Sequence, residues 1–195
     1  MAQIDGIPNG LILDLATGTG KIALLATRCN IGSTVVGVDF CPQMLAVARD
    51  KVKAASLESR VLLVQGDALR LPFPDNTFDC VTIGFALRNV TSIVSLFSEM
   101  ARVTKQGGKM VSLELTRPPV RILEPLHKLY IRIVIRCVGG IVSGKWDAYT
   151  YLPQSILEFP SPQEVKKVME DAGWRKVEIH RLTFGTATVQ TGMKG

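Results

Sequence analysis

A short apolar run followed by a glycine turn lies near the start of the chain, which reads Leu11-Ile-Leu-Asp-Leu-Ala-Thr-Gly-Thr-Gly-Lys21. Such a run is typical of a buried parallel strand, and Gly18 and Gly20 end it before a helical pattern begins at Ile22. Glycines let the backbone approach a ligand closely, and the free N–H groups at a helix start face whatever binds there. The segment therefore predicts a strand, a binding turn and a helix.

An acidic residue at the end of the next strand points to the same kind of site. Thr34-Val-Val-Gly-Val38 is apolar, and Asp39 follows it at the distance expected of a carboxylate that holds a ribose hydroxyl. The glycine turn also satisfies the looser dinucleotide pattern G-x-G-x-x-A, so a nicotinamide cofactor stays an alternative, as does a tight turn without a ligand. A nucleoside cofactor is the main prediction.

Composition limits the class of protein. The chain has 195 residues, enough for one domain with a substantial core, and a formal net charge of +6. It contains no long Lys/Arg run and only 6% aromatic residues, which argues against nucleic acid as a partner. The four cysteines have no C-x-x-C spacing, so we expect reduced core residues rather than a zinc site. Because no signal or transit peptide is recognisable, we expect a cytoplasmic protein.

Apolar strands and helical patterns alternate as far as Leu115. This alternation predicts a parallel sheet with helices on both faces. Gln106-Gly-Gly108 is expected to end the helix that precedes the last strand of the series. Farther on, Ser161-Pro-Gln-Glu164 has the pattern of a capping box, and residues 177–189 predict two strands joined by a tight bend at Gly185.

A basic stripe runs through residues 120–138, where Arg121, Lys128, Arg132 and Arg136 share one helical face opposite an apolar one. The pattern fits an ordinary surface helix, and equally a helix that lies on a membrane surface or lines a lipid pocket. Both interpretations stay open on the sequence alone.

Residues near the glycine turn favour a single-nucleoside methyl donor over a dinucleotide. Asp67, directly after the third strand, could accept a hydrogen bond from an adenine amino group, and Phe40 and Met44 could sandwich the purine. The pair of strands at the end of the chain, one of which would run antiparallel at the sheet edge, fits the same class.

Four segments of the chain carry a family resemblance. They are Leu13-Asp-Leu-Ala-Thr-Gly-Thr-Gly20, Leu71-Pro-Phe-Pro-Asp-Asn-Thr-Phe-Asp79, Gly84-Phe-Ala-Leu-Arg-Asn-Val90 and Tyr151-Leu-Pro-Gln-Ser-Ile-Leu-Glu-Phe-Pro160. The chain resembles the ubiquinone/menaquinone biosynthesis C-methyltransferases, class I enzymes that use S-adenosylmethionine. The resemblance implies an α/β, Rossmann-like fold: a mostly parallel seven-stranded sheet with an antiparallel C-terminal strand and helices on both faces. Residues 1–195 would form one domain with residues 116–160 as a substrate-side insertion, and the N-terminal lid helix usual in the family would be missing.

Site residues follow from the resemblance and from the pattern above. The donor would be held by residues at the ends of the first four strands: Asp14, Ala16, Gly18, Thr19, Gly20, Asp39, Phe40, Met44, Asp67, Ala68 and Gly84. At Gly84 some family members have a serine. Residues expected beside the transferred methyl group are Arg88, Asn89, Asp147 and Tyr149, with Tyr151 and His127 as further candidates.

The reaction implied is C-methylation of a prenylated quinol, of the demethylmenaquinol or demethoxyubiquinol type. The basic stripe would then contact a membrane surface, and the protein could act as a homodimer or within a biosynthetic complex. The alternatives are a methyltransferase for another small or lipid acceptor, a nicotinamide-dependent dehydrogenase, and a subunit that binds the donor without turnover.

Overall fold

The fold is known from a computed structural model, which describes residues 6–116 and 159–195. The strands of the described residues are β1 Leu11–Leu15, β2 Thr34–Asp39, β3 Val61–Gln65, β4 Phe78–Gly84, β5 Thr104–Leu115, β6 Trp174–Leu182 and β7 Ala187–Lys194. The helices are α1 Lys21–Cys29, α2 Pro42–Ala54, α3 Ile93–Val103 and α7 Pro162–Asp171, with short 3₁₀ turns at Leu87–Asn89 and Thr183–Gly185.

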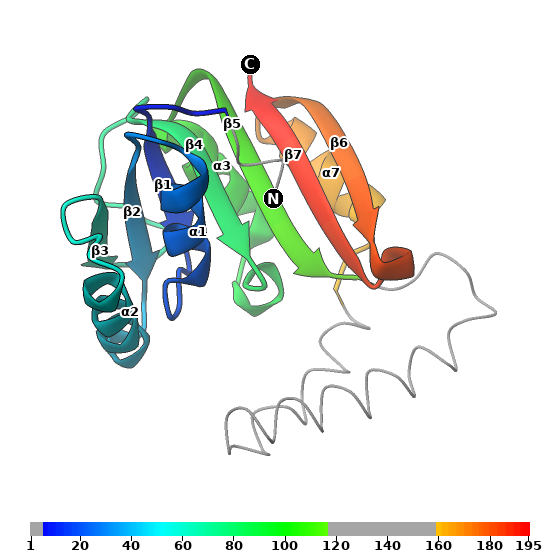
Figure 1. Cartoon of the computed structure of the whole chain (residues 1–195). Helices are drawn as coiled ribbons and strands as arrows, with labels where there is room; N and C mark the ends of the chain where they lie inside the picture. The colour runs from blue at the N-terminus through cyan, green and yellow to red at the C-terminus, as the bar shows by residue number, and fades with distance from the viewer. Residues whose placement is uncertain (1–5, 117–158) are drawn as a thin grey trace, which may run out of the picture.

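The strands form one seven-stranded sheet in the order β3-β2-β1-β4-β5-β7-β6 (Figure 1). The first five strands are parallel, and β7 lies antiparallel between β5 and β6. This arrangement confirms the predicted seven-stranded, mostly parallel sheet with an antiparallel C-terminal strand. The expected place of that strand at the sheet edge is wrong, because β6 forms the edge and β7 lies inside it. The strand order reverses between β1 and β4, and in open parallel sheets such a reversal is where ligands bind, beyond the carboxyl ends of the strands.

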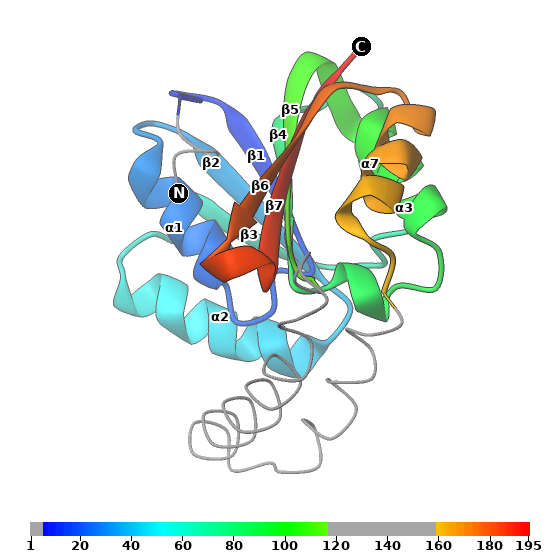
Figure 2. The same cartoon turned by 90° about the vertical axis from the view of Figure 1, so that its right-hand side faces the viewer.

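Helices cover the sheet on both sides, as predicted (Figure 2). On the side of α1 and α2, the core contains residues such as Ile12, Ala26 and Val35. On the side of α3 and α7, the larger core cluster includes Phe97, Met169 and Trp174, and the Trp174 indole N–H donates to the Phe97 carbonyl at 3.1 Å. The sheet is packed on both faces by these two cores, which hold in place the strands that carry the predicted site residues.

The capping box begins α7 where the sequence predicted. The Ser161 hydroxyl accepts from the Glu164 N–H at 3.4 Å, and the Glu164 carboxylate accepts from the Ser161 N–H at 2.7 Å, which confirms the capping box. Pro42 occupies the first turn of α2, and Ser92 caps α3. The expectation of core cysteines holds for Cys80 but is wrong for Cys29, which is exposed.

The predicted end of α3 is also wrong. The helix ends at Val103, and the residues around Gly107 already belong to β5, where Thr104 pairs with Phe78. Pairing with β4 overrides the local stop signal in the two glycines.

Candidate active site

A cavity of about 700 Å³ opens at the carboxyl ends of β1, β2, β3 and β4. Its volume is within the range of small-molecule sites. The described residues that line it are Ala16, Gly18, Val38, Asp39, Phe40, Cys41, Met44, Gly66, Asp67, Ala68, Leu69, Gly84, Phe85, Ala86, Asn89, Val90 and Thr91. The structure therefore brings together most of the residues that the sequence predicted for the donor.

The turn after β1 has an unusual backbone. Ala16, Gly18 and Gly20 all have positive φ, at 49°, 56° and 76°. A Cβ on Gly20 would lie 3.2 Å from the Ala48 Cβ, so glycine lets α1 approach α2. Ala16 and Gly18 line the cavity, whereas Thr19 is half-buried beside it and Gly20 caps α1.

Asp14, near the end of β1, stabilises this turn by a hydrogen bond with Thr17. Its carboxylate is buried and accepts hydrogen bonds from the hydroxyls of Thr17, at 2.6 Å, and Thr82, at 2.8 Å. Burial raises the pKa of Asp14 to about 6, against the lowering effect of these two bonds. The structure places Asp14 beneath the glycine turn, where it positions Thr17, and outside the cavity lining.

Asp39 joins two of the cavity walls. One of its carboxylate oxygens accepts from the Gly18 N–H at 2.7 Å, and the other accepts from the Cys41 N–H at 2.8 Å. The carboxylate is thus oriented by the glycine turn and by the start of α2. Beside it, Phe40 and Met44 leave 78% and 45% of their surfaces exposed, which provides apolar area for a flat ligand.

The wall opposite the glycine turn comes from the segment after β3. Asp67 accepts from the Leu69 N–H at 2.8 Å, and the Gly66 N–H donates to the Asp39 carbonyl at 3.1 Å. Ala68 lines the cavity next to them. At the end of β4, a Cβ on Gly84 would lie 2.3 Å from the Ile22 Cδ1, so a serine there would require Ile22 to move.

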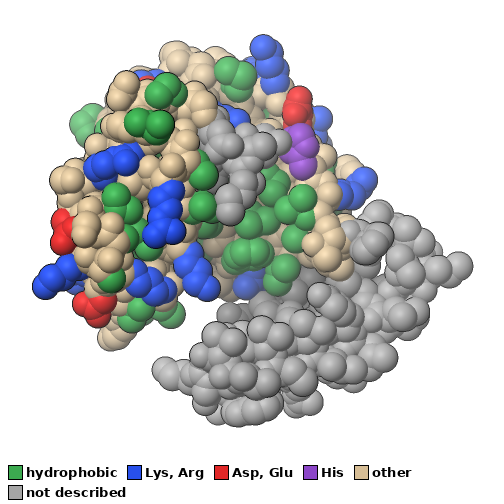
Figure 3. Space-filling view, in the orientation of Figure 1, with side chains coloured by type: hydrophobic (Ala, Val, Ile, Leu, Met, Phe, Trp, Pro, Cys, Tyr) green, Lys and Arg blue, Asp and Glu red, His purple; other side chains and the backbone are tan. Residues whose placement is uncertain are grey.

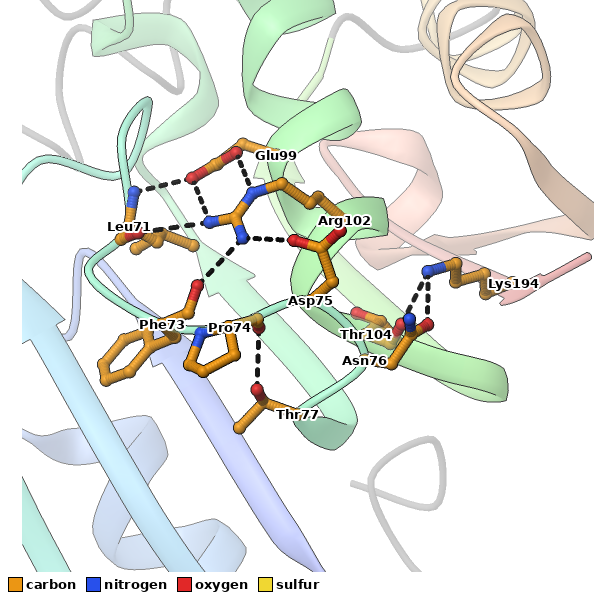
Figure 4. Close-up of polar contacts among 10 residues, drawn as sticks. All are labelled: Leu71, Phe73, Pro74, Asp75, Asn76, Thr77, Glu99, Arg102, Thr104 and Lys194. Carbon is orange, nitrogen blue, oxygen red and sulfur yellow. Dashed lines mark hydrogen bonds and ion pairs between the residues drawn. The ribbon is translucent and has the colours of Figure 1, made fainter.

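The chain that follows this wall is anchored to α3 (Figure 4). The Arg102 guanidinium donates to the carbonyls of Leu71 and Phe73 at 3.1 and 2.8 Å and to the carboxylates of Asp75 and Glu99. Glu99 also accepts from the Leu71 N–H, and the hydrogen bond from Arg102 lowers the pKa of Glu99. Arg102 therefore acts as a clamp that holds the segment Leu71-Pro-Phe-Pro-Asp-Asn-Thr-Phe-Asp79 against α3, next to the cavity.

Arg88 and Asn89 occupy the 3₁₀ turn after β4 and face different surroundings. Asn89 is exposed and lines the cavity. The Arg88 side chain is only 9% exposed and pairs with Glu114 of β5, which is also buried. Glu114 accepts from the Arg88 N–H at 3.3 Å and the Leu115 N–H at 2.9 Å as well. Burial raises the pKa of Glu114, although the Arg88 charge opposes the change.

Some predicted site residues lie outside the part of the chain that the structure describes. They are Asp147 and Tyr149, together with Tyr151, His127 and the basic stripe of residues 120–138. Within the described ranges, no cluster of three or more His, Cys, Asp or Glu side chains could hold a metal ion. In the same ranges, no helix is long and apolar enough to cross a membrane.

The sequence analysis missed Phe85 and Cys41, which line the cavity, and Glu114, the buried partner of Arg88. Phe85 directly follows β4 and Cys41 lies two residues after the end of β2, so proximity to strand ends was a usable signal. Glu114 could have been found as an acidic residue within the apolar run Met110–Leu115, because a buried charge requires a partner.

The cavity fits S-adenosylmethionine. It combines a carboxylate oriented at the end of β2, a second acid at the end of β3 and exposed apolar side chains between them. These groups match a ribose, an adenine edge and a purine face respectively.

Comparisons with known proteins agree with this reading. Residues 2–194 match the model of the ubiE/COQ5 methyltransferase family. Among curated proteins, demethylmenaquinone methyltransferase of Thermus thermophilus is 45% identical over 93% of this chain and 81% of its own length. The ubiquinone/menaquinone biosynthesis C-methyltransferase UbiE of Geobacter sulfurreducens is 43% identical over 96% of this chain and 73% of its own length.

Solved structures share the fold at low sequence identity. A SAM-dependent methyltransferase from Aquifex aeolicus has a TM-score of 0.71 at 20% identity, covering 97% of this chain and 85% of that one. Phosphoethanolamine N-methyltransferase 2 of Haemonchus contortus, solved in complex with S-adenosyl-L-methionine, has a TM-score of 0.71 at 17% identity, covering 97% of this chain and 49% of that one. These structures support the fold assignment.

Proposed function

Because the chain belongs to the ubiE/COQ5 methyltransferase family, it is an S-adenosylmethionine-dependent methyltransferase of menaquinone or ubiquinone biosynthesis, and we propose that it methylates a ring carbon of a prenylated quinol. The observation that carries the proposal is the cavity at the ends of β1 to β4, with Asp39 oriented in it and Asn89 at its rim. Residues 1–195 would act as one domain, with residues 116–160 on the acceptor side.

The donor side of the cavity provides binding and orientation. Asp39 would hold the ribose, Asp67 and Ala68 the adenine edge, and Phe40 and Met44 the purine faces. The turn from Ala16 to Gly20 would lie against the methionine part. When bound, S-adenosylmethionine supplies a methyl group already activated by its sulfonium. What remains for the protein is to align the acceptor carbon with that methyl group and to make it a better nucleophile.

The acceptor side would raise the electron density of the quinol ring. Loss of a hydroxyl proton moves charge onto the ring carbon, and a positioned donor stabilises the oxyanion that results. Asn89 would orient the ring oxygen from the cavity rim. The Arg88 guanidinium, predicted beside the methyl group, is paired with Glu114 and does not line the donor cavity, so its role would be to hold the turn that carries Asn89. An arginine side chain has no acceptor atom and cannot take up that proton. Asp147 and Tyr149 are our candidates for that step.

We also propose that the protein works at a membrane surface. The basic stripe of residues 120–138 would meet anionic headgroups, and blue Lys and Arg side chains outnumber red acidic ones on the face in Figure 3. Vesicles with and without anionic lipid would test this by co-sedimentation of the full chain. Equal sedimentation with both would contradict it.

The function is tested by binding and turnover together. We would titrate the chain with S-adenosylmethionine and, separately, NADH by calorimetry, and then add demethylated benzoquinol or naphthoquinol acceptors under reducing conditions. We expect donor binding and a methylated product with at least one ring. Donor binding without product from either ring would favour a non-catalytic subunit or another acceptor, and NADH binding in place of the methyl donor would overturn the assignment.

A further inference from the structure

A second, smaller hollow lies next to the donor cavity. Its volume is about 280 Å³, and its described lining residues are Leu87, Arg88, Val90, Thr91, Ile93, Phe159 and Pro160. Val90 and Thr91 line both spaces, so the chain from Leu87 to Ile93 separates them. The hollow therefore continues the cavity on the side of α3 and the start of α7.

The walls of this hollow are apolar apart from Arg88 and Thr91. Leu87 and Phe159 belong to the larger hydrophobic core, and Val90 and Ile93 pack against it. The Arg88 charge is compensated by Glu114, because both side chains are buried and paired. The hollow thus offers apolar contact area without an uncompensated charge.

We propose that this hollow binds the first part of the isoprenoid tail of the acceptor; this inference rests on the proposed function. A quinol ring beside Asn89 has its polar groups in the large cavity, while its apolar tail needs a path away from the polar donor. A tail that passes over half-buried Val90 and exposed Thr91, which line both spaces, reaches the hollow, and the apolar walls there remove it from water. The hollow is a tail subsite, and it makes the KM of the acceptor depend on tail length.

A single substitution in the first turn of α3 tests the subsite. Ile93 begins the helix and lines only the smaller hollow, whereas the next residue, Val94, is 57% exposed and lines neither space. An acidic side chain is compatible with a helix N-terminus, so both Ile93→Glu and Val94→Glu are expected to fold. Ile93→Glu therefore places a negative charge inside the proposed subsite, and Val94→Glu places the same charge outside it.

We would measure the kinetics of the full chain with acceptors that share one ring and carry no tail, one isoprene unit or three. For the unmodified chain, KM should fall as the tail lengthens. Ile93→Glu should raise the KM of the three-unit acceptor about tenfold or more, with little effect on the tail-less acceptor or on S-adenosylmethionine. Val94→Glu should leave the KM values of all three acceptors unchanged. If Ile93→Glu does not fold, Ile93→Ala should still raise the long-tail KM by about threefold.

Two results would overturn the inference and leave the proposed function intact. They are methylation with a KM independent of tail length, and an Ile93→Glu defect that is equal with and without a tail. Failure to methylate any of the quinols would instead remove the proposed function, and the tail subsite with it.

Discussion

Asp39 is the residue with the most direct expected effect on donor binding. Its carboxylate accepts from the Gly18 and Cys41 N–H groups, and a ribose hydroxyl would complete its set of partners. Asp39→Asn removes the charge that strengthens the hydrogen bond to the ribose hydroxyl, and such a charge-assisted bond contributes about 1.5–3 kcal/mol. We expect the Kd for S-adenosylmethionine to rise about tenfold to a hundredfold by calorimetry. Asp50→Asn on the exposed side of α2 is the control and should bind normally.

Asp14 is expected to make stability depend on pH. Its folded-state pKa of about 6 lies above its usual value of 3.8, so the folded chain binds the extra proton and loses stability as pH rises from about 4 to about 6. At about 1.4 kcal/mol per pKa unit, the loss approaches 3 kcal/mol. Urea unfolding at several pH values should show that the free energy of unfolding of Asp14→Asn rises relative to that of the unmodified chain as pH increases over this interval. A constant difference between the two proteins would contradict the expected pKa.

The Arg88–Glu114 pair should behave as a unit. Glu114→Gln leaves a buried guanidinium without its counter-charge, which costs about 3–5 kcal/mol in unfolding experiments. Replacing both residues, by Arg88→Met with Glu114→Leu, should recover much of this stability but no methyl transfer. Recovery of activity in the double variant would show that Arg88 has no role beyond packing.

The Arg102 clamp links α3 to the segment that follows the cavity wall, from Leu71 to Asp75. Arg102→Leu removes its bonds to two backbone carbonyls and two carboxylates, and we expect a loss of about 2 kcal/mol and faster hydrogen exchange in residues 71–77. Lys166→Ala is the control, since it breaks only an exposed ion pair with Glu170 at 3.7 Å, a kind of contact that contributes little. Equal exchange in the two variants would exclude a clamp.

Local signals predicted most elements well, and long-range contacts explain where they did not. The Ser161 capping box is a short-range feature, and α7 begins where it indicates. The end of α3 depends instead on the pairing of Thr104 with Phe78, which no local pattern reveals. The partner of Arg88 was missed for the same reason, because Glu114 reaches it only once β4 and β5 are paired.

Donor binding should stabilise the whole sheet through the strands that meet at the cavity. At a concentration of one hundred times Kd, a ligand that binds only the folded chain adds about 2.7 kcal/mol. For a domain of this size that corresponds to a rise in Tm of about 5–10 °C. Thermal unfolding with and without S-adenosylmethionine measures the rise, and an equal concentration of NADH should produce none.

The arrangement of the whole molecule was predictable because its main signals are repeated along the chain. The apolar runs at residues 11–15 and 34–38 are parallel strands, and the alternating series ends at Leu115 as expected. The residues that follow β1, β2 and β3 meet at one edge, as parallel pairing requires. An antiparallel strand in the last pair was expected, but at the sheet edge, whereas β7 lies between β5 and β6. The local pattern and the composition contain no information on strand order.

The left-handed backbone at Ala16 has a counterpart across the cavity, where Phe85 has a φ of 57°. Both residues have a side chain that disfavours this conformation, and both are held in it by hydrogen bonds from the sheet: the Thr17 N–H donates to the Val38 carbonyl and the Phe85 N–H to the Leu113 carbonyl. The conformational entropy of the two segments around Ala16 and Phe85 is therefore lost when the chain folds, and donor binding does not have to reduce it again. Donor association can then proceed without a slow rearrangement of these walls, at a rate governed by diffusion and orientation.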